Sequence, residues 1–254
     1  MAETKRLRIF AGPNGSGKST LFADISGRYS AGYYVNSDNI EGELSKTKYL
    51  NLEDFGLSLT QKDLDLFLRH KDSVTLLNKA KAAGFPIDLY IKENVIVDNS
   101  KNTHSYEASL ISSFIRRNLM INGISFSFET VMSHVSKVNE ISYANALGYK
   151  TYLYFVCLDD PLLNVSRVND RTGKGGHNVP EDRVLSRYER TLENLLPAMK
   201  IAQKAYLMDN SGDELVLVGV MNQGKITREI EKHLKPNWYL NYVVNRLSKD
   251  YNLL

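Results

Sequence analysis

The stretch from Gly12 to Ser19 constrains the fold of this chain more than any other. Its residues, GPNGSGKS, match the G-x-x-x-x-G-K-[ST] spacing at every position. Residues 7–11 form a short apolar run that predicts a strand, and residues 19–25 predict the start of a helix. Because this is the context in which the motif binds phosphates, the sequence predicts a site for a nucleoside triphosphate. The alternative is a chance glycine-rich turn, which the agreement of motif and context disfavours.

Each residue type in this loop has a physical role in phosphate binding. Several backbone N–H groups must approach one polyphosphate, which requires that side chains be absent at Gly12, Gly15 and Gly17. The positive end of the following helix adds to the attraction. Lys18 is expected over the β and γ phosphates, and the Ser19 hydroxyl is expected to ligate Mg²⁺. The residues expected to bind ATP are Gly12, Pro13, Asn14, Gly15, Ser16, Gly17, Lys18, Ser19 and Thr20.

Composition limits the class of protein. The chain has 254 residues, enough for one large domain or for a core domain with an insertion, and 43% of them are hydrophobic. The single cysteine, Cys157, cannot form an internal disulfide. No apolar run resembles a signal peptide or reaches the roughly 20 residues that span a membrane. We therefore expect a cytoplasmic protein without a membrane partner. The net charge of +3 gives no reason to expect nucleic acid as a partner.

Predicted strands and helices alternate along most of the chain. This alternation predicts an α/β fold with a doubly wound, mostly parallel sheet. The run at 150–158 is apolar throughout, which is typical of a central strand. Further strands are predicted at 32–38, 124–129 and 204–208, helices at 105–121, 135–147, 161–170 and 180–201, and a hairpin at 214–227.

Two segments lie outside this pattern. Residues 45–103 contain helical spacing up to Gly84, followed by a stretch at 89–97 that fits either a strand or a helix. We interpret 45–103 as a helical insertion on the substrate side and 228–254 as a C-terminal helical tail. Both belong, on this interpretation, to a single domain of the P-loop kinase type that spans 1–254.

Two acidic residues lie at the ends of predicted strands, where ligands bind in doubly wound sheets. Asp38 is the candidate base for an acceptor hydroxyl in phosphoryl transfer, and Glu129 is the candidate acid near Mg²⁺. The alternatives are that Asp38 caps the following helix and that Glu129 is a surface acid. Asp159 and Asp160 precede Pro161 and are more simply explained as an N-cap pair.

Arginines on two successive predicted helices suggest a lid. A glycine-rich loop at 172–178 joins these helices and can act as a hinge. Guanidinium groups neutralise the charge of a transferring phosphoryl group without a protonation step. The alternative is a solvated face paired with glutamates. The arginines are Arg167 and Arg171 on the first helix and Arg183, Arg187 and Arg190 on the second.

Together these segments resemble the zeta-toxin-like P-loop kinases, in the branch often labelled predicted ABC-type ATPases. The resemblance covers about 6–38 and 105–210. It rests on the glycine loop and on four further segments, namely Val35-Asn36-Ser37-Asp38, Phe128-Glu129-Thr130, Gly175-Gly176-His177-Asn178-Val179-Pro180 and Arg187-Tyr188-Glu189-Arg190.

The resemblance implies a kinase that uses ATP and Mg²⁺. Zeta toxins phosphorylate UDP-N-acetylglucosamine on a sugar hydroxyl, and a small antitoxin restrains them. By this likeness Asp38 is the base, Lys18 clamps the phosphates, and Arg171 and Arg187 supply lid charge. Ser133 stands where the toxins have an arginine, which leaves the acceptor open. Ser19 and Glu129 would hold the metal, and the acceptor would contact Asn36, Glu129, Thr130 and His177.

Two other functions stay open from the residues. The first is an ATPase or nucleotide switch that drives a partner, although the chain has no LSGGQ-type signature and no [NT]-K-x-D loop. The second is a nucleic-acid 5′-hydroxyl kinase, which the modest charge disfavours. The resemblance to zeta toxins implies a small-molecule hydroxyl acceptor and an antitoxin-like protein as partners.

Overall fold

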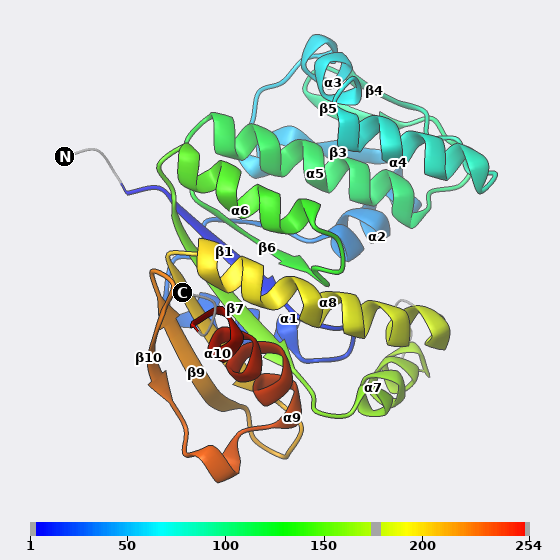
Figure 1. Cartoon of the computed structure of the whole chain (residues 1–254). Coiled ribbons are helices and arrows are strands. Elements are labelled where there is room, and N and C mark those ends of the chain that lie inside the picture. Colours follow the sequence, from blue (N-terminus) through cyan, green and yellow to red (C-terminus); the bar gives the residue numbers. More distant parts are fainter. Residues whose placement is uncertain (1–3, 174–178, 252–254) are drawn as a thin grey trace. The chain divides into compact units, whose positions relative to one another are not determined.

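The computed structural model describes residues 4–173 and 179–251 (Figure 1). The chain divides into two compact units, which we call the first and second unit. The first unit combines Met1–Ala31 with Ser127–Leu254, and the second is Gly32–Phe126. The interpretation of the whole chain as one domain stays a prediction.

A mostly parallel sheet forms the centre of the first unit. Its strand order there is β10-β9-β8-β7-β1-β6, with β1, β7 and β8 parallel and β9 and β10 antiparallel. The segment predicted as a central strand is β7, and its position between β1 and β8 confirms that prediction. The strands are β1 (Arg6–Ala11), β6 (Phe126–Thr130), β7 (Lys150–Cys157), β8 (Lys204–Asp209), β9 (Val216–Asn222) and β10 (Lys225–Glu229).

Helices pack on both faces of this sheet. On one face Leu21 of α1 (Lys18–Arg28) packs against Phe10, Val156 and Met208. Strand residues of the opposite face, such as Leu153, are fully buried. No helix in the described ranges is long and apolar enough to cross a membrane. The other helices of this unit are α6 (Ser136–Ala146), α7 (Pro161–Gly173), α8 (Glu181–Ile201), η2 (Lys232–Leu234), α9 (Asn237–Tyr239), the π-helical η3 (Leu240–Val244) and α10 (Asn245–Tyr251).

Two predicted boundaries in this unit are wrong. Thr172 belongs to α7 rather than to a loop, because the helix continues to Gly173. Arg228 belongs to β10 rather than to the helical tail. Gln223 and Gly224 both have positive φ, 48° and 76°, which suits a tight hairpin turn, and β10 then pairs with β9 as far as Glu229.

The second unit contains the predicted insertion. Residues 89–97 form a hairpin of strands, β4 and β5, and with β3 they make a small antiparallel sheet of order β3-β5-β4. The insertion therefore contains a small sheet as well as helices and is not wholly helical. The elements are β2 (Tyr33–Val35), α2 (Ser37–Thr47), β3 (Tyr49–Asn51), η1 (Leu52–Phe55), α3 (Gln61–Leu68), α4 (Lys71–Ala82), β4 (Leu89–Lys92), β5 (Val95–Asp98) and α5 (Ser105–Ile121), the last as predicted.

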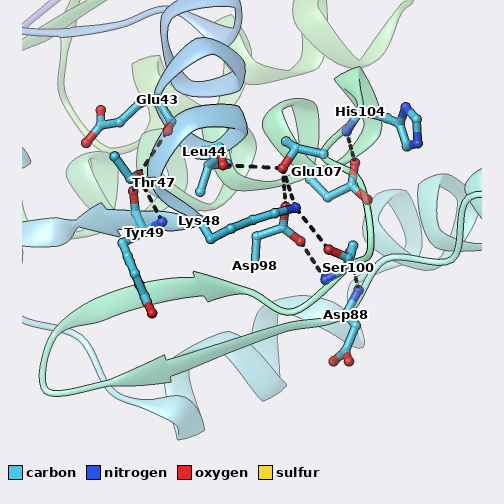
Figure 2. A network of polar contacts seen from close by, with 11 residues as sticks. Glu43, Leu44, Thr47, Lys48, Tyr49, Asp88, Asp98, Ser100, His104 and Glu107 are labelled. Atoms are coloured by element: carbon cyan, nitrogen blue, oxygen red, sulfur yellow. Dashed lines mark hydrogen bonds and ion pairs between the residues drawn. The ribbon is translucent and has the colours of Figure 1, made fainter.

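A polar network fastens the end of α2 to the small sheet (Figure 2). Lys48, in a left-handed conformation after α2, donates to Asp98 Oδ2 at 3.3 Å, to the Ser100 carbonyl at 2.9 Å and to Thr103 Oγ1 at 3.0 Å. Burial alone would raise the pKa of Asp98. Hydrogen bonds from Thr103 and Ser100 and the charge of Lys48 outweigh burial, so the pKa is lowered and the buried carboxylate is charged.

Candidate active site

The glycine loop between β1 and α1 needs its glycines for its own packing. Gly12 has φ +144°, and a Cβ there would lie 2.0 Å from the carbonyl oxygen of Val156. Gly17 has φ +102°, and a Cβ there would lie 2.6 Å from Nδ2 of Asn210. Side chains at Gly12 and Gly17 are therefore excluded by Val156 and Asn210 of the same protein, as well as by the approach of a phosphate.

The side chains of two asparagines donate hydrogen bonds to carbonyl oxygens of the glycine loop. Asn164 of α7 is fully buried, and its Nδ2 donates to the carbonyl oxygen of Asn14 at 2.6 Å. Asn210, after β8, donates from Nδ2 to the carbonyl oxygen of Ser16 at 2.8 Å. Arg167 of α7 donates to the Asn210 carbonyl at 2.9 Å. Since these contacts tie down loop carbonyls, they favour a conformation whose N–H groups are available to an anion.

Some buried polar atoms of this region have no hydrogen-bond partner. They include Oδ1 of Asn14, Oγ of Ser16 and Oδ1 of Asn164, counted within the part of the chain that the structure describes. Such atoms lower stability and are uncommon away from functional sites. The loop region is therefore built at a cost to the fold, as expected for a binding site.

Lys18 lies over the loop. Its Nζ donates to the carbonyl oxygens of Gly12 at 3.0 Å and Pro13 at 2.8 Å. The ammonium is thus kept beside the N–H groups that would bind phosphate. This position suits a cation that transfers its hydrogen bonds to phosphate oxygens when a nucleotide enters.

The two predicted metal ligands lie together. The Ser19 hydroxyl, in the first turn of α1, donates to Oε2 of Glu129 near the end of β6 at 3.1 Å. Both are oxygen donors, which Mg²⁺ prefers, and they leave most coordination positions to phosphate and water, as Mg²⁺ sites of kinases do. No cluster of three or more His, Cys, Asp or Glu suited to a metal occurs among the described residues. The oxygen atoms of Ser19 and Glu129 fit a Mg²⁺ that arrives with its nucleotide. The neighbouring Thr130 accepts from the Met132 N–H at 2.9 Å and so supports the turn after β6.

Asp38 lies in the first turn of α2 rather than at a strand end, because β2 stops at Val35. The cap of α2 is Asn36, whose Oδ1 accepts from the N–H groups of Asp38 at 2.8 Å and Asn39 at 3.3 Å. Asn36 also donates to the Tyr34 hydroxyl at 2.9 Å. The capping alternative thus applies to Asn36, and it leaves the exposed Asp38 carboxylate at the positive end of the helix.

The two arginine-bearing helices pack on each other. Arg171 lies exposed in the last turn of α7, and Arg187 lies half-buried in α8. His177 lies outside the described residues. The contact between the helices is a small apolar cluster of Val165, Val168, Val179 and Val184.

The acidic pair after β7 has a structural use. Asp160 accepts from the Leu162 N–H at 2.8 Å, which confirms it as a cap of α7. Asp159 instead holds the C-terminal tail, because its Oδ1 accepts from the Trp238 N–H at 2.9 Å. The Trp238 indole donates to Asp209 at 2.7 Å. Asp159 and Asp209 therefore bind the C-terminal tail at the ends of β7 and β8.

Comparison with known proteins gives a match in structure only. No family model and no curated protein sequence matches the chain. A chain of the crystal structure of AvrRxo1-ORF1:AvrRxo1-ORF2 with sulphate ions matches at 15% identity with a TM-score of 0.57, over 92% of this chain and 63% of that chain. The complex with ATP matches at 14% identity with a TM-score of 0.51, over 89% and 61%.

The fold is that of the zeta-toxin-like P-loop kinases. The sequence motifs predicted this fold, and the doubly wound, mostly parallel sheet is confirmed. The chain spans about three fifths of the length of the AvrRxo1 chains that it matches. A chain of the PezAT chromosomal toxin-antitoxin system of Streptococcus pneumoniae also matches, at 10% identity with a TM-score of 0.47, over 98% of this chain and 88% of that chain.

Proposed function

We propose that the protein is an ATP-dependent phosphotransferase that moves the γ phosphate of ATP to a hydroxyl group of a small molecule. The observation that carries the proposal is the 3.1 Å hydrogen bond between Ser19 and Glu129 beside a complete phosphate-binding loop. A hydroxyl and a carboxylate at that place are what a nucleotide-bound Mg²⁺ requires. The fold likeness to a complex crystallised with ATP supports ATP as the nucleotide.

The chain's residues divide the work of phosphoryl transfer. Backbone N–H groups of the loop and Lys18 bind the phosphates. Ser19 and Glu129 would hold a Mg²⁺ ion, which would supply neutralising positive charge to the phosphates. Arg171 and Arg187 supply positive charge to the transferring group. Asp38 accepts the proton of the acceptor hydroxyl as its oxygen bonds to the γ phosphorus. The bond between that phosphorus and the bridging oxygen of ATP breaks, and ADP leaves.

The second unit is proposed to bind the acceptor. Further along α2, the helix that carries Asp38 in its first turn, Glu43 and Thr47 line an open groove of about 540 Å³. That volume suits a small molecule. Burial and the nearby charge of Asp54 raise the pKa of Glu43. The groove is also lined by Tyr49, Asn51, Lys92, Glu93, Val95 and Val97.

A sugar nucleotide is the first acceptor to test. The resemblance to zeta toxins suggests a UDP-N-acetyl-sugar, and the groove offers an aromatic ring, an amide, carboxylates and a lysine for its polar groups.

A protein partner of antitoxin type is proposed as well, because the matched AvrRxo1-ORF1 structures are complexes with ORF2. If this holds, inducing the wild-type chain in bacteria without a partner should slow growth, and inducing Lys18→Ala should not.

Transfer from γ-labelled ATP to a panel of acceptors tests the proposal. The panel holds sugar nucleotides, nucleosides and oligonucleotides, and labelled product is separated from free phosphate. We expect Lys18→Ala to remove transfer, and Asp38→Asn to remove transfer while ATP affinity stays within about twofold. Asp213→Asn, an exposed acid in the first unit, is the matched control and should behave as wild type.

The outcomes separate the open alternatives. Phosphate release without labelled acceptor would favour an ATPase or switch, and label on an oligonucleotide end would favour a nucleic-acid kinase. Normal transfer by Asp38→Asn would show that another group is the base.

A further inference from the structure

One face of the sheet in the first unit gathers basic side chains from several strands. Residues that pair across neighbouring strands share a face of the sheet. Arg6 pairs with Lys150, and Arg8 pairs with Tyr152, which pairs in turn with Lys204. We call this surface the basic face and define it by Arg6, Arg8, Lys150, Lys204, Lys225 and Arg228 with the tyrosines Tyr152, Tyr154 and Tyr206.

The basic face lies away from the glycine loop. Arg6, Lys150 and Lys204 are the first residues of their strands, whereas the loop follows the last residue of β1. Helix α1 packs on this side of the sheet through Leu21, Phe22 and Ile25, which join an apolar cluster with Phe10, Val156, Met208, Tyr154 and Tyr206. The cations at the strand beginnings are not part of that cluster; Lys150 is exposed, and Arg6, Arg8 and Lys204 are half-buried.

Five of the six cations of this face have no carboxylate partner among the described residues. None of Arg8, Lys150, Lys204, Lys225 and Arg228 forms an ion pair with a carboxylate of the described residues. Six of the 32 basic residues lie here, so the other 26 stand against 29 acidic residues. A chain with a net charge of only +3 therefore carries one strongly positive face and a slightly negative remainder.

The tyrosines of this face are arranged as hydrogen-bond donors rather than as stacking platforms. The rings of Phe10 and Tyr154 stack with centroids 5.0 Å apart, and those of Tyr154 and Tyr206 with centroids 5.1 Å apart. Lys204 and Arg8 lie over the rings of Tyr206 and Tyr152. The ring faces are thus used within the protein, and the Tyr154 hydroxyl is hydrogen-bonded to the side chain of Arg8. Burial raises the pKa of Tyr154, so its hydroxyl keeps its proton.

We propose that the basic face binds the phosphate backbone of a nucleic acid without reading its sequence. From β1 to β10 the cations extend over four strand spacings, about 19 Å, which is too far for one phosphate group but suits a polymer of phosphates. Arginine, lysine and tyrosine hydroxyls are the side chains that contact phosphate oxygens. Cores of protein–protein interfaces are depleted in lysine, which disfavours a protein partner.

Fluorescence anisotropy with a labelled single-stranded RNA of mixed sequence tests this surface. Six phosphate contacts predict a slope of about −4 in a plot of log affinity against log salt concentration. The variant Lys150→Gln/Lys204→Gln should reduce that slope by about 1.4 and weaken binding about 25-fold at 0.1 M salt. The matched control is Lys62→Gln/Lys71→Gln, which removes the same charge from exposed positions of α3 and α4 and should bind as wild type.

Three results would overturn the proposal. The first is no RNA binding at 50 mM salt, and the second is equal affinity and slope for the two double variants. The third is binding of a poly-glutamate of equal charge as tightly as the RNA, which would identify an acidic protein as the partner. Unchanged melting temperatures establish that both variants are folded. Because the surface is separate from the loop, ATP affinity should be equal in both, so failure here would leave the proposed kinase function untouched.

Discussion

A substitution at Asn164 can test whether its hydrogen bond to the glycine loop supports ATP binding, without creating a cavity. It is fully buried, and its Nδ2 donates to the Asn14 carbonyl at 2.6 Å across 150 residues of sequence. Asn164→Asp preserves the shape of the side chain but replaces the NH₂ group with oxygen. When the new carboxyl is ionised, two oxygens face each other and the carbonyl loses its donor.

The size of the effect follows from that one contact. A buried carbonyl left without a donor costs about 1–3 kcal/mol, which corresponds to about 5- to 150-fold in an equilibrium constant. In the free protein the loop can relax, and ATP binding must restore it, so we expect the ATP Kd to rise by up to this factor at neutral pH. Burial raises the pKa of the new carboxyl above its usual value of about 3.9. Below the raised pKa its O–H can donate to Asn14, so affinity should recover as pH falls and be lost again as pH rises.

Titration of both proteins with a fluorescent ATP analogue between pH 5 and pH 8 measures this. Asn122→Asp is the matched control, because Asn122 also donates to a backbone carbonyl, that of Asn118 at 2.8 Å, but is exposed. It should leave the Kd unchanged at every pH. The reasoning is refuted if Asn164→Asp lowers the melting temperature while its ATP Kd stays within twofold of wild type across the range.

Two further substitutions probe the fold around the site. Gly12→Ala would place a Cβ 2.0 Å from the Val156 carbonyl oxygen, so we expect a loss of more than about 2 kcal/mol in the free energy of unfolding by urea; a midpoint equal to that of wild type would contradict this. Lys48→Met removes one of the groups that lower the pKa of Asp98. A lowered pKa contributes stability above about pH 4 that is lost as pH falls, so the difference from wild type should be largest near pH 7 and shrink at pH 3, and a constant difference would contradict it.

Local patterns were sufficient for most elements. The helix Ser105–Ile121 and the strand Lys150–Cys157 were predicted because each has a strong period or a continuous apolar run. The stretch at 89–97 was ambiguous, because a short apolar run fits a helix or a strand equally well. Only the positive φ of Glu93 and Asn94 and the pairing with β3 resolve it as a hairpin.

The site was predictable where a motif carries it. The glycine loop is read from contiguous residues, and Glu129 from its place at a strand end. Asn164 and Asn210 were missed, because a single asparagine has no signal in sequence and each contacts the loop over more than a hundred residues, 150 and 194. The basic face was missed for a similar reason, since a net charge does not reveal which cations a sheet brings together.

The division of the chain has a consequence for its synthesis. Strand β1 ends at Ala11, but its neighbours in the sheet, β6 and β7, begin at Phe126 and Lys150. At about 5–20 residues per second, the ribosome needs roughly 6 to 23 s to pass from the end of β1 to the start of β6. During that interval residues 32–126 are synthesised, while β1 has no partner strand in the nascent polypeptide.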